Sequence, residues 1–259
     1  MKKFLLGTNW KMNKTLAEGL DYTTGLTTII APYSQFEFFI IPPYTHLWKI
    51  KEAITAQKSP LKLGAQNMHQ QDSGQFTGEI SPVMLAEIGI DIIELGHSER
   101  RQYFNETDET VNLKTLAALK HGFTPLICIG EQLVDKDYHV SKEMLAKQLK
   151  IALKDVLADD IGNFWIAYEP VWAIGVNGIP AETPYVEEIH DFLRSILIDR
   201  YGARGADVPL LFGGSVNINN ARDYALLKNV DGLFIGRSAW EPDLFKAIIV
   251  AVGDLSNKV

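Results

Sequence analysis

The sequence predicts an α/β protein with one domain, residues 1–259, in which eight parallel strands alternate with helices and close into a (β/α)8 barrel. Two observations lead to this fold class. Short apolar runs rich in β-branched or aromatic residues recur along the whole chain, and most of the gaps between them have helical spacing. No Pro- or Ser-rich linker, low-complexity tract or charge block divides the 259 residues, so nothing marks a domain boundary.

Eight apolar runs are expected to form the strands. They cover residues 4–10, 36–42, 62–66, 91–95, 125–130, 164–168, 208–212 and 231–235. Between them, apolar residues from 145 to 156 recur at three- and four-residue steps, which is typical of an amphipathic helix. A second helix is expected from Thr183, a capping residue, through Pro184 in its first turn to Gly202 at its exit.

A doubly wound open sheet is the alternative fold, but its dinucleotide fingerprint GxGxxG is absent. The barrel has a functional consequence, because polar residues at the carboxyl ends of its strands face the active site.

Charge and cysteine content exclude several classes of function. The 25 Lys and Arg are outnumbered by 32 Asp and Glu, and the net charge of −7 argues against a nucleic-acid or anionic-membrane partner. The single cysteine, Cys128, excludes an internal disulfide framework. The apolar run at 4–6 is too short for a secretory signal, and no run has transmembrane length. We therefore expect a cytoplasmic protein.

The expected strand ends carry chemically active residues. They are Asn9 and Lys11, Gln66 and Asn67, His97 to Glu99, Gly130 and Glu131, Glu169, Gly213 to Ser215, and Gly236 with Arg237. An acid, an imidazole, a lysine and two glycine-rich turns in one barrel mouth suit proton transfer on a small phosphorylated substrate. Neither HExxH, a Cys/His cluster nor GxxxxGK is present, so we expect no metal and no cofactor.

Each residue type also has an ordinary structural role. A lysine near a strand end is usually solvated, yet Lys11 follows an apolar run and should point into the mouth. His97 begins a helical turn, where the helix dipole favours neutral imidazole. Gly213 to Ser215 can be a simple turn or a phosphate cradle of backbone N–H groups. The other five histidines are read as structural: His46, His69, His121, His139 and His190.

Six motifs in one order resemble the triosephosphate isomerase family over essentially the whole chain. They are NWKMN (9–13), GAQN with FTGE (64–67, 76–79), ELGHSERR (94–101), CIGE (128–131), AYEPVWAIG (167–175) and GGSVN (213–217). The resemblance implies that Glu169 is the general base and that neutral His97 is the electrophile that shuttles protons between the substrate oxygens. It also implies that Lys11 supplies positive charge, that Asn9 donates a supporting hydrogen bond, and that Glu99 supports the site.

The resemblance further implies a phosphate site and a partner subunit. Backbone N–H groups of Gly175, Ser215, Gly236 and Arg237 match the family's phosphate-binding positions, with Gly214 in support. The segment around Thr77 resembles the loop by which one subunit inserts into another, which implies a homodimer.

Two departures from the family pattern concern the substrate. The lid reads IGVNGIPA, with Pro180 at its far hinge, and loop eight reads GRSAWEP, with Arg237 in place of a glycine. Both resemble the erythrulose-phosphate isomerase branch, whose four-carbon substrate equals dihydroxyacetone phosphate with an added hydroxymethyl group. The motif count favours interconversion of dihydroxyacetone phosphate and glyceraldehyde 3-phosphate. The four-carbon substrate remains the alternative, and a non-catalytic phosphate-binding barrel is a remote third.

Overall fold

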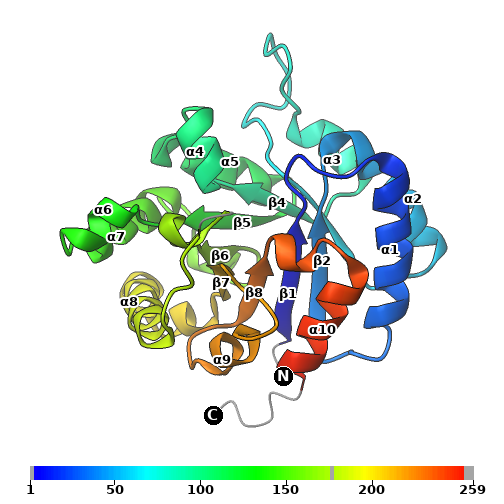
Figure 1. The fold of residues 1–259 in the computed structure, drawn as a ribbon. Coiled ribbons are helices and arrows are strands. Elements are labelled where there is room, and N and C mark those ends of the chain that lie inside the picture. Colours follow the sequence, from blue (N-terminus) through cyan, green and yellow to red (C-terminus); the bar gives the residue numbers. More distant parts are fainter. Residues whose placement is uncertain (1–2, 176–177, 254–259) are drawn as a thin grey trace.

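A computed structural model describes residues 3–175 and 178–253 and shows a closed barrel of eight parallel strands in chain order (Figure 1). Each strand pairs with the next one, and β8 closes the ring on β1. The strands are β1 (Phe4–Asn9), β2 (Phe36–Ile41), β3 (Lys62–Ala65), β4 (Ile92–Leu95), β5 (Thr124–Ile129), β6 (Trp165–Tyr168), β7 (Leu210–Gly214) and β8 (Gly232–Ile235). The predicted fold class is confirmed, and every expected strand begins and ends within two residues of an observed one.

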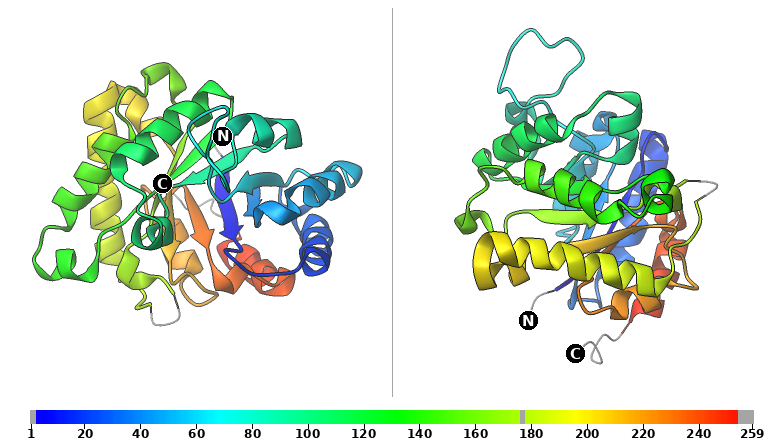
Figure 2. Two further views of the ribbon diagram at one scale, coloured as in Figure 1. Left: turned by 90° about the horizontal axis from the view of Figure 1, so that it is seen from above. Right: turned by 90° about the vertical axis from the view of Figure 1, so that its left-hand side faces the viewer.

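Helices surround the barrel, as the view along another axis makes clear (Figure 2). They are α1 (Leu16–Ile30), α2 (Leu47–Ala56), α3 (Pro82–Ile88), α4 (Ser98–Tyr103), α5 (Asp108–Lys120), α6 (Leu133–Asp137), α7 (Ser141–Ala152), α8 (Thr183–Tyr201), α9 (Ala221–Leu226) and α10 (Pro242–Val252). Within the two described ranges, no helix combines the length and the apolar character needed to cross a membrane.

The two helices expected from the sequence are present with shifted ends. Helix α7 stops at Ala152, four residues short of the expected end, because the chain turns there and Asp155 adopts a positive φ of 63°. Helix α8 begins at Thr183, but Glu182 is the capping residue, since its carbonyl accepts the first helical N–H bonds. Gly202 ends α8 as expected.

Alternate residues of the strands fill the barrel interior with apolar side chains. Phe39 lies between the rings of Trp165 and Phe234, at centroid distances of 5.4 and 5.7 Å. On β4, Ile92 belongs to this interior cluster. Glu94 follows two residues later and is therefore directed to the same side, below the carboxyl end of the strand.

A long loop between β3 and α3 projects away from the barrel (Figures 1 and 2). Residues 71–79 of this loop are all exposed. Its base is closed by the His69 N–H, which donates to the Ile80 carbonyl at 2.8 Å, and Phe76 packs on the His69 ring at 4.0 Å. The loop holds its own shape while presenting Thr77 to solvent.

Candidate active site

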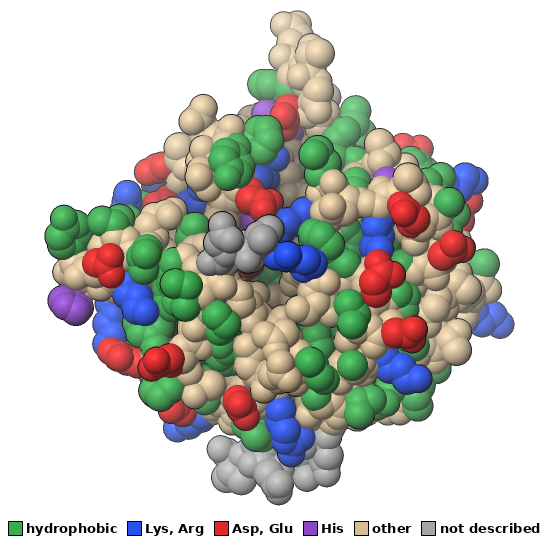
Figure 3. Space-filling view, in the orientation of Figure 1, with side chains coloured by type: hydrophobic (Ala, Val, Ile, Leu, Met, Phe, Trp, Pro, Cys, Tyr) green, Lys and Arg blue, Asp and Glu red, His purple; other side chains and the backbone are tan. Residues whose placement is uncertain are grey.

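A cavity of about 770 Å³ opens at the carboxyl ends of the strands. Basic and acidic side chains gather around a hollow at the centre of the face seen in Figure 3. All ten residues predicted from the sequence to form the site line this one cavity: Asn9, Lys11, His97, Glu99, Glu169, Gly175, Gly214, Ser215, Gly236 and Arg237. The strand order brings them together from positions far apart in the chain.

Glu169 follows β6 and is held in place from both neighbouring strands. Its N–H donates to the Ile129 carbonyl of β5 at 2.8 Å. A Cβ on Gly213 of β7 would lie 2.5 Å from Glu169 Cγ, and a Cβ on Gly130 would lie 1.9 Å from the Glu169 carbonyl oxygen. Both positions therefore require glycine for the carboxylate to enter the cavity.

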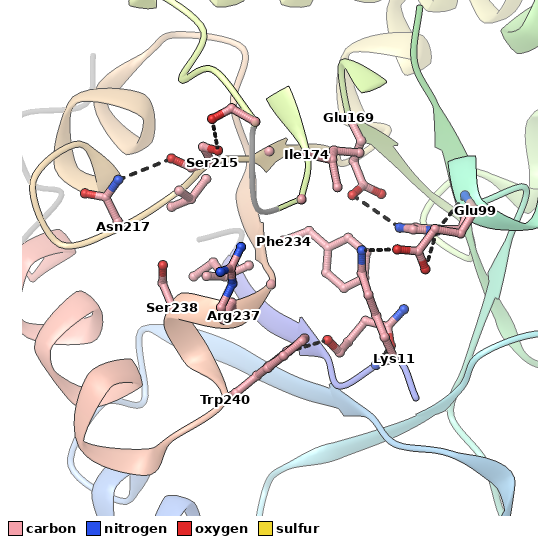
Figure 4. A pocket seen from close by; sticks show the side chains of 18 of the residues that line it. Lys11, Glu99, Glu169, Ile174, Ser215, Asn217, Phe234, Arg237, Ser238 and Trp240 are labelled. Carbon is pink, nitrogen blue, oxygen red and sulfur yellow. Dashed lines mark hydrogen bonds and ion pairs between the residues drawn. The ribbon is translucent and has the colours of Figure 1, made fainter. Parts of the chain in front are cut away.

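The proton of His97 is fixed on one ring nitrogen by the start of α4. The N–H of Glu99 donates to His97 Nδ1 at 3.2 Å, so Nδ1 is an acceptor and the proton of the neutral ring is on Nε2. Nε2 lies 3.8 Å from Glu169 Oε2 (Figure 4). Burial lowers the pKa of His97, Lys11 lowers it further, and Glu169 opposes both effects. His97 is thus a neutral donor beside a carboxylate.

Lys11 and Asn9 form a connected group at the end of β1. Lys11 adopts a positive φ of 54°, which is costly for a residue with a side chain, and its Nζ donates to Glu99 Oε1 at 2.7 Å. Asn9 Oδ1 accepts from the Lys11 N–H at 2.6 Å and from Gln66 Nε2 at 3.1 Å. Trp240 Nε1 donates to the Asn9 carbonyl at 2.9 Å. These hydrogen bonds hold the side chains of the group in position relative to one another.

The opposite wall of the cavity consists of loops after β6, β7 and β8. Ser215 Oγ lies 2.9 Å from the Ala173 carbonyl and 3.3 Å from that of Gly178, so it joins the loop after β7 to the loop after β6. Arg237 approaches from the end of β8 (Figure 4), and Gly236, the residue before it, also lines the cavity. A short helix, Arg237–Ala239, begins there, so backbone N–H groups gather on this side.

The loop after β6 is tied down on its outer side. Trp172 Nε1 donates to Glu131 Oε1 at 2.9 Å, and Tyr185 OH lies 2.9 Å from the same oxygen. Glu131 thus turns away from the cavity, unlike the other acids at the strand ends. Two residues of the lid segment that departs from the family pattern, 176 and 177, lie outside the described residues.

Several lining residues had no role in the sequence interpretation. They include Phe234, Ser238, Trp240 and Leu244. Trp240 lies four residues beyond Gly236, the glycine that follows β8, and strand-end reasoning does not reach that far. Glu94 was also given no role, although an acid inside an apolar strand is an unusual signal.

Within the described residues, one group of three side chains comes close enough to hold a metal ion, with donor atoms all within 4.8 Å of one another: Glu94, Cys128 and Glu169. Burial raises the pKa of Glu94 and of Cys128 well above their ordinary values, and Glu169 adds to the rise at both. Protonated carboxyl and thiol groups are poor metal ligands. The group therefore suits proton chemistry better than metal binding.

The comparisons with known proteins all indicate one family. The family model described as triosephosphate isomerase matches residues 4–252. An L-erythrulose-1-phosphate isomerase of Rhizobium meliloti (strain 1021) is 49% identical over 91% of both chains. A protein of the same name from Brucella abortus biovar 1 (strain 9-941) is 46% identical over 96% of both. The crystal structure of triosephosphate isomerase from Bartonella henselae superimposes with a TM-score of 0.88 at 34% identity, covering 97% of this chain and 100% of that one.

Proposed function

We propose that this chain, which belongs to the triosephosphate isomerase family, isomerises L-erythrulose 1-phosphate. That it is an isomerase of this family follows from the match over nearly its whole length. The four-carbon substrate is supported by the name shared by relatives that are 44–49% identical over more than nine-tenths of both chains. Sequence motifs alone favour the three-carbon substrate, and these relatives reverse that preference.

Glu169 removes the proton from the carbon next to the substrate carbonyl. Its carboxylate lies 3.8 Å from His97 Nε2, so one bound substrate can contact both groups. Such a proton is only weakly acidic, and a positioned base contributes about 10²–10⁴-fold to its removal. The same carboxyl then returns the proton to the former carbonyl carbon. The product has its carbonyl one carbon further from the phosphate.

His97 and Lys11 stabilise the intermediate enediolate. His97 donates from Nε2 to the carbonyl oxygen and moves a proton between the two substrate oxygens. Lys11 adds a positive charge, and Asn9 offers its second amide hydrogen. Groups fixed in advance in a water-poor site are effective because they need no rearrangement as charge develops. Only protons move, so we propose that no cofactor takes part.

The loops after β6, β7 and β8 bind the phosphate. Backbone N–H groups of Gly175, Ser215, Gly236 and Arg237 are the proposed donors, with Gly214 in support. A non-catalytic phosphate-binding barrel would keep these loops without the base. Here Glu169, His97 and Lys11 line the same cavity as the loops, which supports an enzyme.

The test is a comparison of kcat/KM for L-erythrulose 1-phosphate and for dihydroxyacetone phosphate with the same purified protein. We expect the four-carbon ketose to be preferred by more than about tenfold, the discrimination that a single substrate group provides. The Glu169→Gln variant, purified in parallel, measures any contaminating host isomerase. Preference for dihydroxyacetone phosphate would restore the three-carbon assignment.

We also propose that the chain forms a homodimer through the projecting loop. Residues 71–79, which include Phe76 and Thr77, are exposed, and so is Met12 beside Lys11, at 96%. A second copy would cover these side chains and bring Thr77 near its Lys11. Light scattering should give twice the 29.0 kDa chain mass, and deletion of residues 72–78 should give the monomer mass.

A further inference from the structure

One carboxyl inside the barrel has no place in the proton transfers described above. Glu94 of β4 is 1% exposed. Its Oε2 accepts from Asn9 Nδ2 at 2.6 Å, while its Oε1 accepts from the weak donor Cys128 Sγ at 4.0 Å. Burying a carboxyl is unfavourable unless its hydrogen-bonding capacity is used. Glu94 Oε1 can therefore still take a stronger hydrogen-bond partner than the Cys128 thiol.

Glu94 contrasts with Glu131, another buried carboxyl group near the cavity. Three groups, from Tyr168, Trp172 and Tyr185, converge on Glu131 Oε1. Those contacts hold one oxygen of Glu131 in place, while its Oε2 is buried without a hydrogen-bond partner among the described residues. Within the described part of the chain Glu94 has a single strong donor, Asn9, and perturbed carboxyls in such positions are often functional.

The position of Glu94 in the ring determines which part of a substrate it can meet. In a closed ring of eight strands, β4 lies across the barrel from β8. The loop after β8 carries Gly236 and Arg237, at the phosphate end of the cavity. Glu94 is thus on the side towards which the other end of the substrate extends. Two of its neighbours, Asn9 and Glu169, line the cavity.

There is room for a small polar group beside two neighbours of Glu94. Glu94 itself lines neither cavity, but one of its carboxyl oxygens lies within 4.8 Å of Cys128 Sγ and of a Glu169 carboxylate oxygen. Cys128 and Glu169, together with Gly96 and Gly130, line a second cavity of about 10 Å³. This volume is about that of a single water-sized probe, so it accommodates one hydroxyl group. Burial raises the pKa of Glu94, and the neighbouring Glu169 raises it further. Neutral Glu94 can both donate a hydrogen bond to a hydroxyl and accept one from it.

We propose that Glu94 is a specificity-determining residue, whose carboxyl hydrogen-bonds the terminal hydroxymethyl group of a four-carbon ketose phosphate. This inference rests on the proposed function, since dihydroxyacetone phosphate has no group at that position. When the three-carbon substrate is bound, the Glu94 carboxyl gains no hydrogen bond from it. Sites built around a substrate hydroxyl discriminate against analogues that lack it for this reason.

The test measures kcat/KM for both substrates in Glu94→Leu and Glu94→Gln. Leucine removes the polar group, and we expect kcat/KM for L-erythrulose 1-phosphate to fall at least tenfold relative to that for dihydroxyacetone phosphate. Glutamine keeps a donor and an acceptor, so the ratio should fall less. If the leucine variant does not fold, the glutamine variant must still lower the ratio at least twofold.

Glu131→Gln is the matched control, because it neutralises another buried carboxyl away from the substrate end. This variant should change kcat/KM for both substrates by the same factor and leave the ratio of the two values intact. A parallel loss of both activities in the Glu94 variants would show that Glu94 only holds Asn9, and would overturn the inference while leaving the proposed function standing. Absence of four-carbon turnover by the unmodified protein would overturn both.

Discussion

The wall of the cavity that carries Glu169 and His97 is made of buried side chains, whereas the opposite wall is made of loop backbone and exposed groups. Glu169 and His97 are 7% and 4% exposed. Gly175 and Arg237, on the phosphate side, are both exposed. The first wall holds its groups through Asn9, Lys11, Gln66 and Glu99, as described above. The second is joined chiefly through Ser215.

This difference separates two tasks. Proton transfer needs particular side chains at fixed distances, because a carboxylate or imidazole moved by about 1 Å loses much of its effect. Phosphate binding needs N–H groups, which any residue except proline supplies. Substitutions on the base side should therefore act on kcat, and those on the phosphate side on KM.

The largest effect is expected for Glu169→Gln. The amide has the shape of the carboxylate but cannot accept the substrate proton, so kcat should fall by about 10²–10⁴-fold, the contribution of a positioned base. KM should change little, since the phosphate wall is intact. Steady-state kinetics with the preferred substrate measures both values, and circular dichroism checks the fold. A loss of less than tenfold in kcat would remove Glu169 from its proposed role.

A smaller effect concerns the charge of His97. Because burial lowers its pKa, the midpoint of protonation should lie below the value of 6.5 of an unperturbed histidine side chain. Ring ¹⁵N shifts should therefore report a neutral ring with the proton on Nε2 at pH 7. Lys11 contributes to this lowering, so Lys11→Met should move the titration of His97 to higher pH. Titration of His97 above pH 6.5 in the unmodified protein would contradict the assignment.

The fold could be predicted because the strands alternate with helices and each strand is marked by its apolar run. The catalytic side could be predicted because active side chains directly follow those strands. Helix ends were less certain, since the first turn of α8 is set by the Glu182 carbonyl, and a backbone acceptor leaves no mark in the sequence.

The remaining parts of the site depend on packing that sequence spacing does not contain. Trp240 reaches back from the loop after β8 to the Asn9 carbonyl, a contact between residues at opposite ends of the chain. Glu94 lies within a strand, and only closure of the barrel brings it to Asn9. Glu131 shares its place at a strand end with catalytic groups, yet its three partners turn it outwards.

The smallest effect is expected for Arg237→Gly on the phosphate side. The backbone N–H survives the change, so only the guanidinium charge is lost. Arg237 is exposed, and an exposed ion pair contributes about 0.2–1 kcal/mol, which corresponds to at most about a fivefold rise in KM. The rise should shrink at high ionic strength because salt screens exposed charges. Arg237→Lys should retain most of the affinity, since it keeps the charge. A fall in kcat of more than tenfold with unchanged KM would instead place Arg237 with the base-side residues and erase the contrast between the two walls.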